Sequence, residues 1–322
     1  MDKNATIYVA DTDWLVGRPL QAQLKRAGYE NVLPEPGGAP TNLTEAAQMD
    51  ECFRQHRPAY VFLIGGKTGG IKANQNHPAD LMRDNLLVNC HVIESAYRHG
   101  VKKLLYLASS CVYPKFAVQP MKVDDLMSGR LEPTNEAYAA AKLAGLYLCQ
   151  AYRRQFGKPF ITAIPANVFG PGDDFSLEDS HVIAALMRKM HEAKTLGQSY
   201  VEVWGSGVPR REFIFSHDLA DACLFLMNRY ESEEPINLGV GCDWSIREIA
   251  EIIREVVGYS GDLEFDRNKP DGMPAKLLDS SYLRQMGWKP QTSIREGLSI
   301  TYEWFLQLGL DGNGKQDGRA IL

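Results

Sequence analysis

Short apolar runs alternate with amphipathic stretches along the first half of the chain. The runs predicted to be strands are "TIYVA", "NVLP", "AYVFLIG", "KKLLYLAS" and "FITAIPA". Each of them is continuously apolar and does not alternate between apolar and polar positions, which is typical of parallel strands covered on both faces. The pattern therefore predicts a buried parallel sheet.

The stretches between these runs have helical periodicity. Helices are predicted over about 17–28, 44–57 and 78–99, and a further one begins near Asn135. Strands that alternate with helices in this way predict an α/β fold with a doubly wound parallel sheet, the Rossmann arrangement, in which each crossover is right-handed.

After "NVFGPGDDF" the loops become longer and richer in Gly, Pro and Asp. Three more helices are predicted near 179–194, 216–230 and 246–258. We expect a dinucleotide-binding domain over 1–168 and 213–237, and a smaller, mostly C-terminal substrate-binding domain over 169–212 and 238–311. The tail 312–322 has no core-forming periodicity and is expected to be disordered.

Composition and charge exclude several classes of protein. The chain has 322 residues, of which 44% are hydrophobic, and a formal net charge of -5, so it has no basic footprint for nucleic acid. No apolar stretch approaches the ~20 residues that span a bilayer, and the N-terminus does not resemble a signal peptide. Six cysteines without a CxxC pair argue against a zinc site and a disulfide framework, and favour a cytoplasmic location.

The strongest chemical signal is "LASSCVYP" at 107–114, followed by "YAAAK" at 138–142. Tyr138 and Lys142 lie one helical turn apart, so the ammonium group favours the phenolate and lowers the pKa of the tyrosine. A Tyr–Lys pair at this spacing is usually a surface pair. Here a serine at the end of the preceding strand can hydrogen-bond the same oxygen as the phenol, which indicates proton transfer at a carbonyl or alcohol.

Several motifs identify a resemblance that covers residues 5–308. They are "GGKTGGIKAN", "YLASSCVYPK", "LEPTNEAYAAAKLAG", "PANVFGPGDDF", "SHVIAALMRKMHEA", "VWGSGVPRREFIF" and "KPDGMPAKLLD". The chain resembles the extended short-chain dehydrogenase/reductase superfamily. Within it, the chain is similar to the GDP-L-fucose synthase family, epimerase/reductases that act on a GDP-4-keto-6-deoxyhexose.

The resemblance implies five catalytic residues. Ser109, Tyr138 and Lys142 correspond to the set that serves reduction of the C4 ketone, and Cys111 and His181 to the pair that epimerises C3 and C5. A ketone at C4 acidifies the C–H bonds at both neighbouring carbons. A thiol and an imidazole suit the exchange of those protons because their pKa values bracket neutrality.

The resemblance also implies a binding site for the GDP-sugar and an oligomeric state. The positions expected near the substrate are Asn167, Lys189, Trp204, Arg211 and Lys276. Arg211 and Lys276 could neutralise a diphosphate, and Lys189 stands where the family often has Arg. A homodimer through the helices around 80–99 and 135–155 is implied by the resemblance alone.

The turn after the first strand, "VADTDWLVG", departs from the family's GxxGxxG pattern. Gly17 keeps the third glycine, which lets helix and strand pack, but Asp11 and Trp14 replace the first two. Asp11 puts a negative charge near the expected pyrophosphate, and Trp14 adds bulk where close approach is normally required. Glu35 lies about where an acid would bind an unphosphorylated ribose.

These changes leave three alternatives for the cofactor. A changed loop could still hold NADP(H), helped by "GGKTGG"; the preference could have moved to NAD(H); or cofactor binding could be lost. The residues expected to contact a cofactor are Asp11, Trp14, Leu15, Val16, Gly17, Glu35, Gly65, Gly66, Lys67, Asn85, Tyr138, Lys142, Asn167 and His181. The complete Ser–Tyr–Lys set favours retained binding.

The sequence thus predicts an NAD(P)-dependent epimerase/reductase of the GDP-L-fucose synthase type, with no metal. Two rivals stay open. One is an epimerase or reductase acting on another GDP-4-keto sugar, such as a heptose. The other is a sugar-nucleotide-binding pseudoenzyme with impaired cofactor binding.

Overall fold

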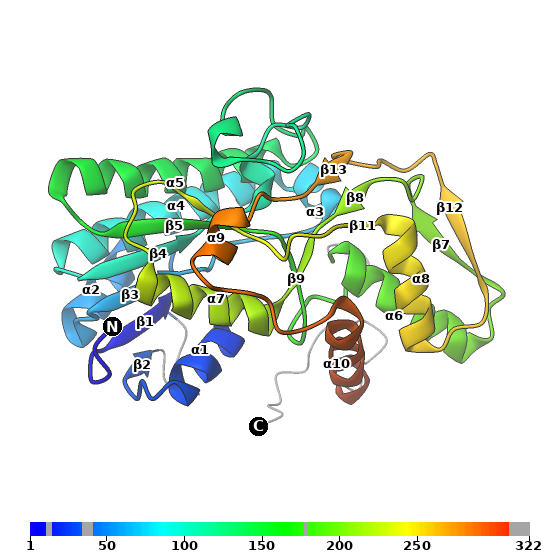
Figure 1. The fold of residues 1–322 in the computed structure, drawn as a ribbon, viewed down its shortest axis with the longest axis horizontal. Helices are drawn as coiled ribbons and strands as arrows, with labels where there is room; N and C mark the ends of the chain where they lie inside the picture. The colour runs from blue at the N-terminus through cyan, green and yellow to red at the C-terminus, as the bar shows by residue number, and fades with distance from the viewer. Residues whose placement is uncertain (11–14, 34–40, 177–179, 309–322) are drawn as a thin grey trace.

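A parallel sheet of six strands forms the centre of the molecule in the computed structural model, which describes residues 1–10, 15–33, 41–176 and 180–308 (Figure 1). Its order is β2-β1-β3-β4-β5-β10. The strands are β1 (Ile7–Ala10), β2 (Val32–Leu33), β3 (Tyr60–Leu63), β4 (Lys103–Leu107), β5 (Phe160–Pro165) and β10 (Ile236–Leu238). Every residue of β1, β4 and β5 is buried, as the continuous apolar runs predicted, and β10 is fully buried as well.

Helices cover both faces of this sheet (Figure 1). One face is covered by α4 (Pro78–Arg98) and α5 (Glu136–Phe156), with α2 (Ala46–His56) packed against α4. The other face is covered by α1 (Gly17–Arg26) and α7 (Ser216–Arg229). The doubly wound α/β fold that the sequence predicted is therefore confirmed.

A second core lies beyond the carboxyl ends of the strands (Figure 1). Its helices are α6 (Val182–Leu196), α8 (Ile246–Val257) and α10 (Ile294–Gln307). Three small sheets accompany these helices. Two of them are pairs of strands, β6 (Asn167–Phe169) with β9 (Phe213–Phe215), and β7 (Tyr200–Trp204) with β12 (Asp262–Asp266). The third has three strands, with β8 (Arg210–Arg211) between β11 (Trp244–Ser245) and β13 (Ala275–Lys276).

The boundaries between the two cores lie near the predicted domain limits. The domain limits themselves remain a prediction. β10 joins the main sheet, whereas β9 pairs with β6 outside it. The stretch from Leu278 to Trp288, which includes α9 (Ser281–Gln285), packs on the first core. The predicted disordered tail lies outside the described residues.

The predicted helices are confirmed, and three were missed. These are α3 (Ile71–Asn76), α9 and α10. For α10 a signal was present, because Ser293 Oγ accepts a hydrogen bond from the Glu296 N–H and begins the helix as an N-cap.

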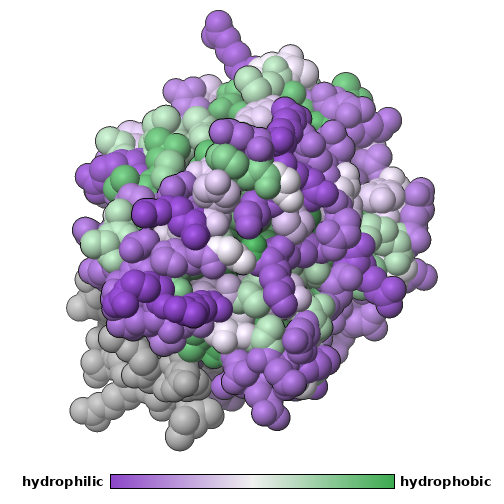
Figure 2. Space-filling model, turned by 90° about the vertical axis from the view of Figure 1, so that its left-hand side faces the viewer, coloured by the Kyte–Doolittle hydropathy of each residue, from purple (hydrophilic) through white to green (hydrophobic). Residues whose placement is uncertain are grey.

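The end of the molecule at the left of Figure 1 is mostly hydrophilic (Figure 2). Apolar residues are scattered among the charged ones on this face (Figure 2). In the part of the chain that the structure describes, no helix is long and apolar enough to cross a membrane.

Gly145 lets α5 approach the sheet and α4. A Cβ at this position would lie 2.5 Å from the Tyr106 hydroxyl and 2.7 Å from Asn89 Nδ2, both of them on buried side chains. Tyr106 also donates a hydrogen bond to the Lys142 carbonyl at 3.1 Å, so this contact supports the helix turn that carries Lys142.

We expect Gly145→Ala to lower the free energy of unfolding by about 1–2 kcal/mol. Overpacking costs about 1–3 kcal/mol, and the better helix propensity of alanine offsets up to ~1 kcal/mol of it. Urea unfolding measures the loss, and a double-mutant cycle with Tyr106→Leu isolates its cause. Because leucine lacks both the ring Cζ and the hydroxyl, each 2.5 Å from the added Cβ, an unchanged penalty in that background would contradict this explanation.

Candidate active site

The switch point of the sheet lies between β1 and β3, because the chain leaves β1 toward β2 on one side and then returns to β3 on the other. Ligands of open α/β sheets bind outside the carboxyl ends of the strands at such a point. A cavity of about 370 Å³ begins here and extends to the second core. Leu15 and Val16 line it at the start of α1, and Ile64 lines it after β3.

Ser109, Tyr138 and Lys142 all line this cavity. Ser109 follows β4 in an extended conformation, and its Oγ accepts a hydrogen bond from the Cys111 N–H at 3.2 Å. Tyr138 lies half-buried on the first turn of α5. The Lys142 side chain is buried one turn later, and its amine donates to the Leu107 carbonyl at 3.3 Å. The amine is thus anchored at the end of β4.

The Cys111 thiol lines the same cavity and receives two donors. Its Sγ lies 3.1 Å from the Lys276 amine and 3.1 Å from Asn135 Nδ2. Burial raises the pKa of the thiol, but the positive Lys276, the hydrogen bond of Ser109 and the charge of His181 outweigh it. The net result is a Cys111 pKa below its ordinary value.

His181 lies at the N-cap position of α6 and also lines the cavity. Its Nδ1 is 3.9 Å from Oδ1 of Asp173, a buried residue. The carboxylate can hold the imidazole in one orientation. The predicted pair of Cys111 and His181 thus meets in one cavity, although their residue numbers differ by 70.

All five positions predicted to contact the substrate line the cavity: Asn167, Lys189, Trp204, Arg211 and Lys276. Asn167 Nδ2 donates to the Glu212 carbonyl at 3.1 Å. The Lys189 amine donates to the Glu202 carbonyl at 3.1 Å and lies 5.4 Å from the centre of the Trp204 ring. Burial lowers the pKa of the Lys189 amine.

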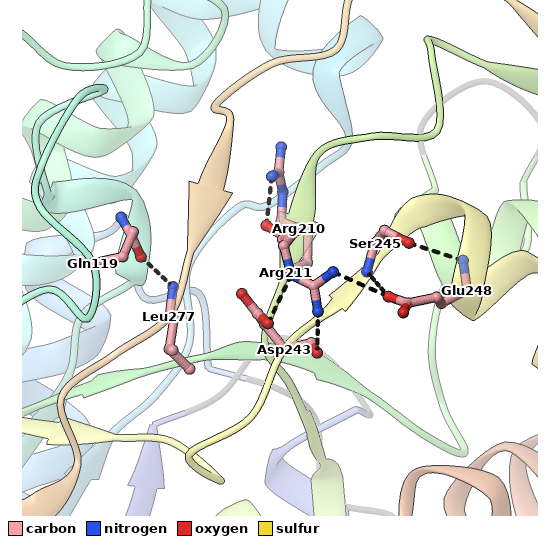
Figure 3. A network of polar contacts seen from close by, with 7 residues as sticks. All are labelled: Gln119, Arg210, Arg211, Asp243, Ser245, Glu248 and Leu277. Carbon is pink, nitrogen blue, oxygen red and sulfur yellow. Dashed lines mark hydrogen bonds and ion pairs between the residues drawn. The ribbon is translucent and has the colours of Figure 1, made fainter.

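Two adjacent arginines have different surroundings because successive strand residues point to opposite faces. Arg210 is paired with Asp243 at 2.9 Å and with Glu248 at 3.2 Å (Figure 3). Arg211 lines the cavity and donates to the Arg210 carbonyl at 2.8 Å (Figure 3). Burial lowers the pKa of Arg211, and the negative Cys111, Glu132 and Asp271 act against this. The positive charge of Arg211 therefore faces the cavity.

A family model described as "NAD dependent epimerase/dehydratase family" matches residues 15–239. The chain belongs to this family. It is 50% identical over 306 residues to GDP-L-fucose synthase 1 of Arabidopsis thaliana, covering 95% of this chain and 94% of the relative. It is 42% identical to GDP-L-fucose synthase of Escherichia coli K12, with 94% and 96% of the two chains covered. The resemblance that the motifs predicted is confirmed.

Solved structures of this family have the same fold. A GDP-6-OMe-4-keto-L-xylo-heptose reductase from C. jejuni matches with a TM-score of 0.90 and 31% identity, over 95% of this chain and 99% of that one. A GDP-L-fucose synthetase from Naegleria fowleri bound to NADP matches with a TM-score of 0.85 and 30% identity, over 95% and 94%. Members of this family are nicotinamide-dependent. The question is therefore whether the residues around the cavity fit a nicotinamide cofactor.

The residues predicted to hold a cofactor lie in two groups. Leu15, Val16, Tyr138, Lys142, Asn167 and His181 line the cavity. The others do not line it and lie at the start of α1, after β3 and on α4: Gly17, Gly65, Gly66, Lys67 and Asn85. Asp11, Trp14 and Glu35 lie outside the described residues.

The turn after β3 is shaped for close approach to the backbone. Gly65 donates its N–H to the Ala10 carbonyl at 2.8 Å, which joins the ends of β1 and β3. Gly66 has φ +146°, and a Cβ there would lie 2.3 Å from Oδ1 of Asn85. Asn85 is buried, and this oxygen has no hydrogen-bond partner among the described residues. Gly66 is thus required by packing against Asn85, and the glycine-rich turn at the switch point, with an unpaired buried oxygen behind it, fits a bound dinucleotide.

Sequence reasoning missed part of the cavity wall. Thr68, Ile71, Lys72 and Asn74 come from the loop after β3 and from α3, and Glu132, Thr134 and Asn135 from the loop before α5. Both groups belong to motifs that carried the resemblance, so a signal for them was present. In the described residues, no group of His, Cys, Asp and Glu side chains could hold a metal ion.

Proposed function

We propose that this protein is an NADP(H)-dependent epimerase/reductase that inverts C3 and C5 and reduces the C4 ketone of a GDP-4-keto-6-deoxyhexose. A single observation carries the proposal. One cavity brings together two kinds of proton-transfer machinery, the Ser109–Tyr138–Lys142 set and the Cys111–His181 pair. The named relatives at 42–50% identity support the substrate class.

The epimerisation uses the Cys111–His181 pair. The Cys111 thiolate takes a proton from the carbon beside the ketone, and the electron pair of the C–H bond moves into the carbonyl. His181, in its protonated form, returns a proton to the carbon from the other face of the sugar. Ser109 donates a hydrogen bond to the ketone oxygen, which stabilises the negative charge that develops there.

Reduction uses the other set. NADPH, when bound, supplies the hydride that reduces C4. Tyr138 donates the proton to the C4 oxygen, and the buried Lys142 amine stabilises the phenolate that remains. Leu15, Val16 and Gly66 would hold the dinucleotide, while Arg211 and Lys189 would neutralise the diphosphate of the sugar nucleotide.

NADP(H) is proposed ahead of NAD(H) because three similar structures were solved with NADP bound or in the presence of NADPH. Equilibrium titration of the purified protein with NADPH and with NADH, followed by nicotinamide fluorescence, tests the choice. We expect saturable binding of NADPH at lower concentration than NADH. Saturable binding of neither would favour the sugar-nucleotide-binding pseudoenzyme.

A second substrate class is favoured by the match to heptose reductases, one of them with a TM-score of 0.90. Oxidation of NADPH with a GDP-4-keto-6-deoxyhexose and with a GDP-4-keto-heptose separates the two. We expect the higher kcat/KM with the 6-deoxyhexose, since the fucose synthase relatives are more similar in sequence. A higher kcat/KM with the heptose would assign the rival function.

A homodimer through α4 and α5 is also proposed. Both helices carry partly exposed apolar side chains, Met82 on α4 and Tyr147 and Phe156 on α5. A second copy packed on these helices would bury them. Sedimentation of the wild type and of Tyr147→Glu tests this, and a monomeric wild type would contradict it.

A further inference from the structure

The sulfur of Cys111 has a specific lysine beside it. The Lys276 side chain is 93% buried from solvent, since its relative exposure is 7%, and its Nζ lies 3.1 Å from the Cys111 Sγ. An ammonium group has three donors and no acceptor, so it can only donate to the sulfur. A thiolate is the better acceptor of that hydrogen bond, because it carries the full negative charge.

The charged groups around the sulfur come from several elements, and among the hydrogen bonds to it the Lys276 ammonium is the charged donor. Lys276 reaches it from β13, His181 from the start of α6, and Arg211 from β8. The acids near these groups are Glu132, whose Oε2 is paired with the Lys115 amine at 3.1 Å, Asp271, which acts on Arg211, and Asp173, which lies 3.9 Å from His181. Positive groups near the sulfur favour the thiolate over the thiol.

The backbone around Lys276 is held on both sides, which fixes where its side chain begins. Lys276 pairs with Arg211 across β13 and β8, and its carbonyl accepts a hydrogen bond from the Glu212 N–H at 3.0 Å. The next residue, Leu277, donates its N–H to Gln119 Oε1 at 2.7 Å (Figure 3). Leu278 donates to Glu212 Oε2 at 2.9 Å.

We propose that Lys276 is a positioning residue that keeps Cys111 deprotonated, so that the base for epimerisation is a thiolate before substrate arrives. This rests on the proposed function, and it differs from the diphosphate contact that the sequence suggested for Lys276. The thiolate takes a proton from the sugar carbon and becomes a thiol. The thiol then returns that proton to solvent, and His181 regains from solvent the one it donated, so the charges balance over a turnover.

Alkylation of Cys111 at a series of pH values tests this without sugar or cofactor, since the thiolate is the form that reacts with iodoacetamide. The tryptic peptide 104–115, LLYLASSCVYPK, contains Cys111 as its one cysteine, and the peptide 230–247 contains Cys242 as the reference. Partial burial and the nearby Glu212 and Asp243 raise the pKa of the Cys242 thiol. In the wild type we expect the midpoint of Cys111 alkylation to lie below that of Cys242.

Lys276→Met removes the charge and keeps a side chain of similar length. We expect it to raise the midpoint of Cys111 by about 1–3 pH units, the size of effect that an adjacent opposite charge has on a pKa. Lys276→Arg keeps a positive charge and should stay closer to the wild type. The midpoint of Cys242 should not move in either variant. Thermal unfolding establishes that each variant is folded, and Lys276→Gln is the neutral alternative if methionine is not tolerated.

Two outcomes would overturn the proposal. One is a wild-type Cys111 midpoint at or above that of Cys242, which needs no variant. The other is a neutral variant whose KM for the sugar nucleotide rises while the Cys111 midpoint stays in place, because Lys276 would then be a diphosphate ligand. Failure of the proposed sugar chemistry would leave both alkylation results interpretable.

Discussion

Tyr138→Phe is expected to lower kcat for reduction of the C4 ketone by about 10²–10⁴-fold, the usual contribution of a positioned general acid. The substitution removes the hydroxyl that supplies the proton to the C4 oxygen and keeps the ring that lines the cavity. Lys142, whose amine is anchored on the Leu107 carbonyl, would then have no phenolate to stabilise. NADPH oxidation with the GDP-4-keto-6-deoxyhexose measures the loss.

The matched control for this variant is Tyr147→Phe. Tyr147 lies on the same helix, is 39% exposed and does not line the cavity, so its hydroxyl should have no effect on kcat. Binding of NADPH should be preserved in Tyr138→Phe, and exchange of the C3 and C5 protons should continue because it depends on Cys111 and His181. Reduction by Tyr138→Phe at the wild-type rate would exclude Tyr138 as the proton donor.

Cys111→Ala is expected to slow proton exchange at C3 and C5 by at least ~10²-fold. The base is lost, whereas Tyr138, Lys142 and the hydroxyl of Ser109 remain. Mass spectrometry after reaction in deuterated water measures the result: the wild-type product should carry deuterium at both carbons, and the variant should release a reduced sugar without it.

Cys242→Ala is the control, since Cys242 is exposed and does not line the cavity. It should incorporate deuterium as the wild type does. Full incorporation by Cys111→Ala would assign the proton abstraction to another group. Cys111→Ala could also lose both deuterium incorporation and reduction while its NADPH binding is unchanged. This result would mean that the enzyme reduces only the epimerised sugar. Proton exchange measured without NADPH then isolates the epimerisation step.

Much of the sheet could be predicted from local pattern alone. The runs "TIYVA" and "KKLLYLAS" are continuously apolar because both faces of their strands are covered, and that requirement is visible in the sequence. Short elements were harder to predict. α3 and α9 have six and five residues, too few for a helical period to stand out from a loop, and β8 and β13 have two residues each.

The amino-acid sequence alone determined the fold class and predicted candidate catalytic residues, because apolar periodicity and motif spacing are local properties. It placed Tyr138 one turn before Lys142, and Ser109 at the end of a strand. Only the tertiary structure decided which side chains meet. Lys276 and Cys111 are 165 residues apart, and their contact exists because β13 pairs with β8 beside the end of β4. Hydrogen bonds between distant strands set such distances, and no local pattern records them.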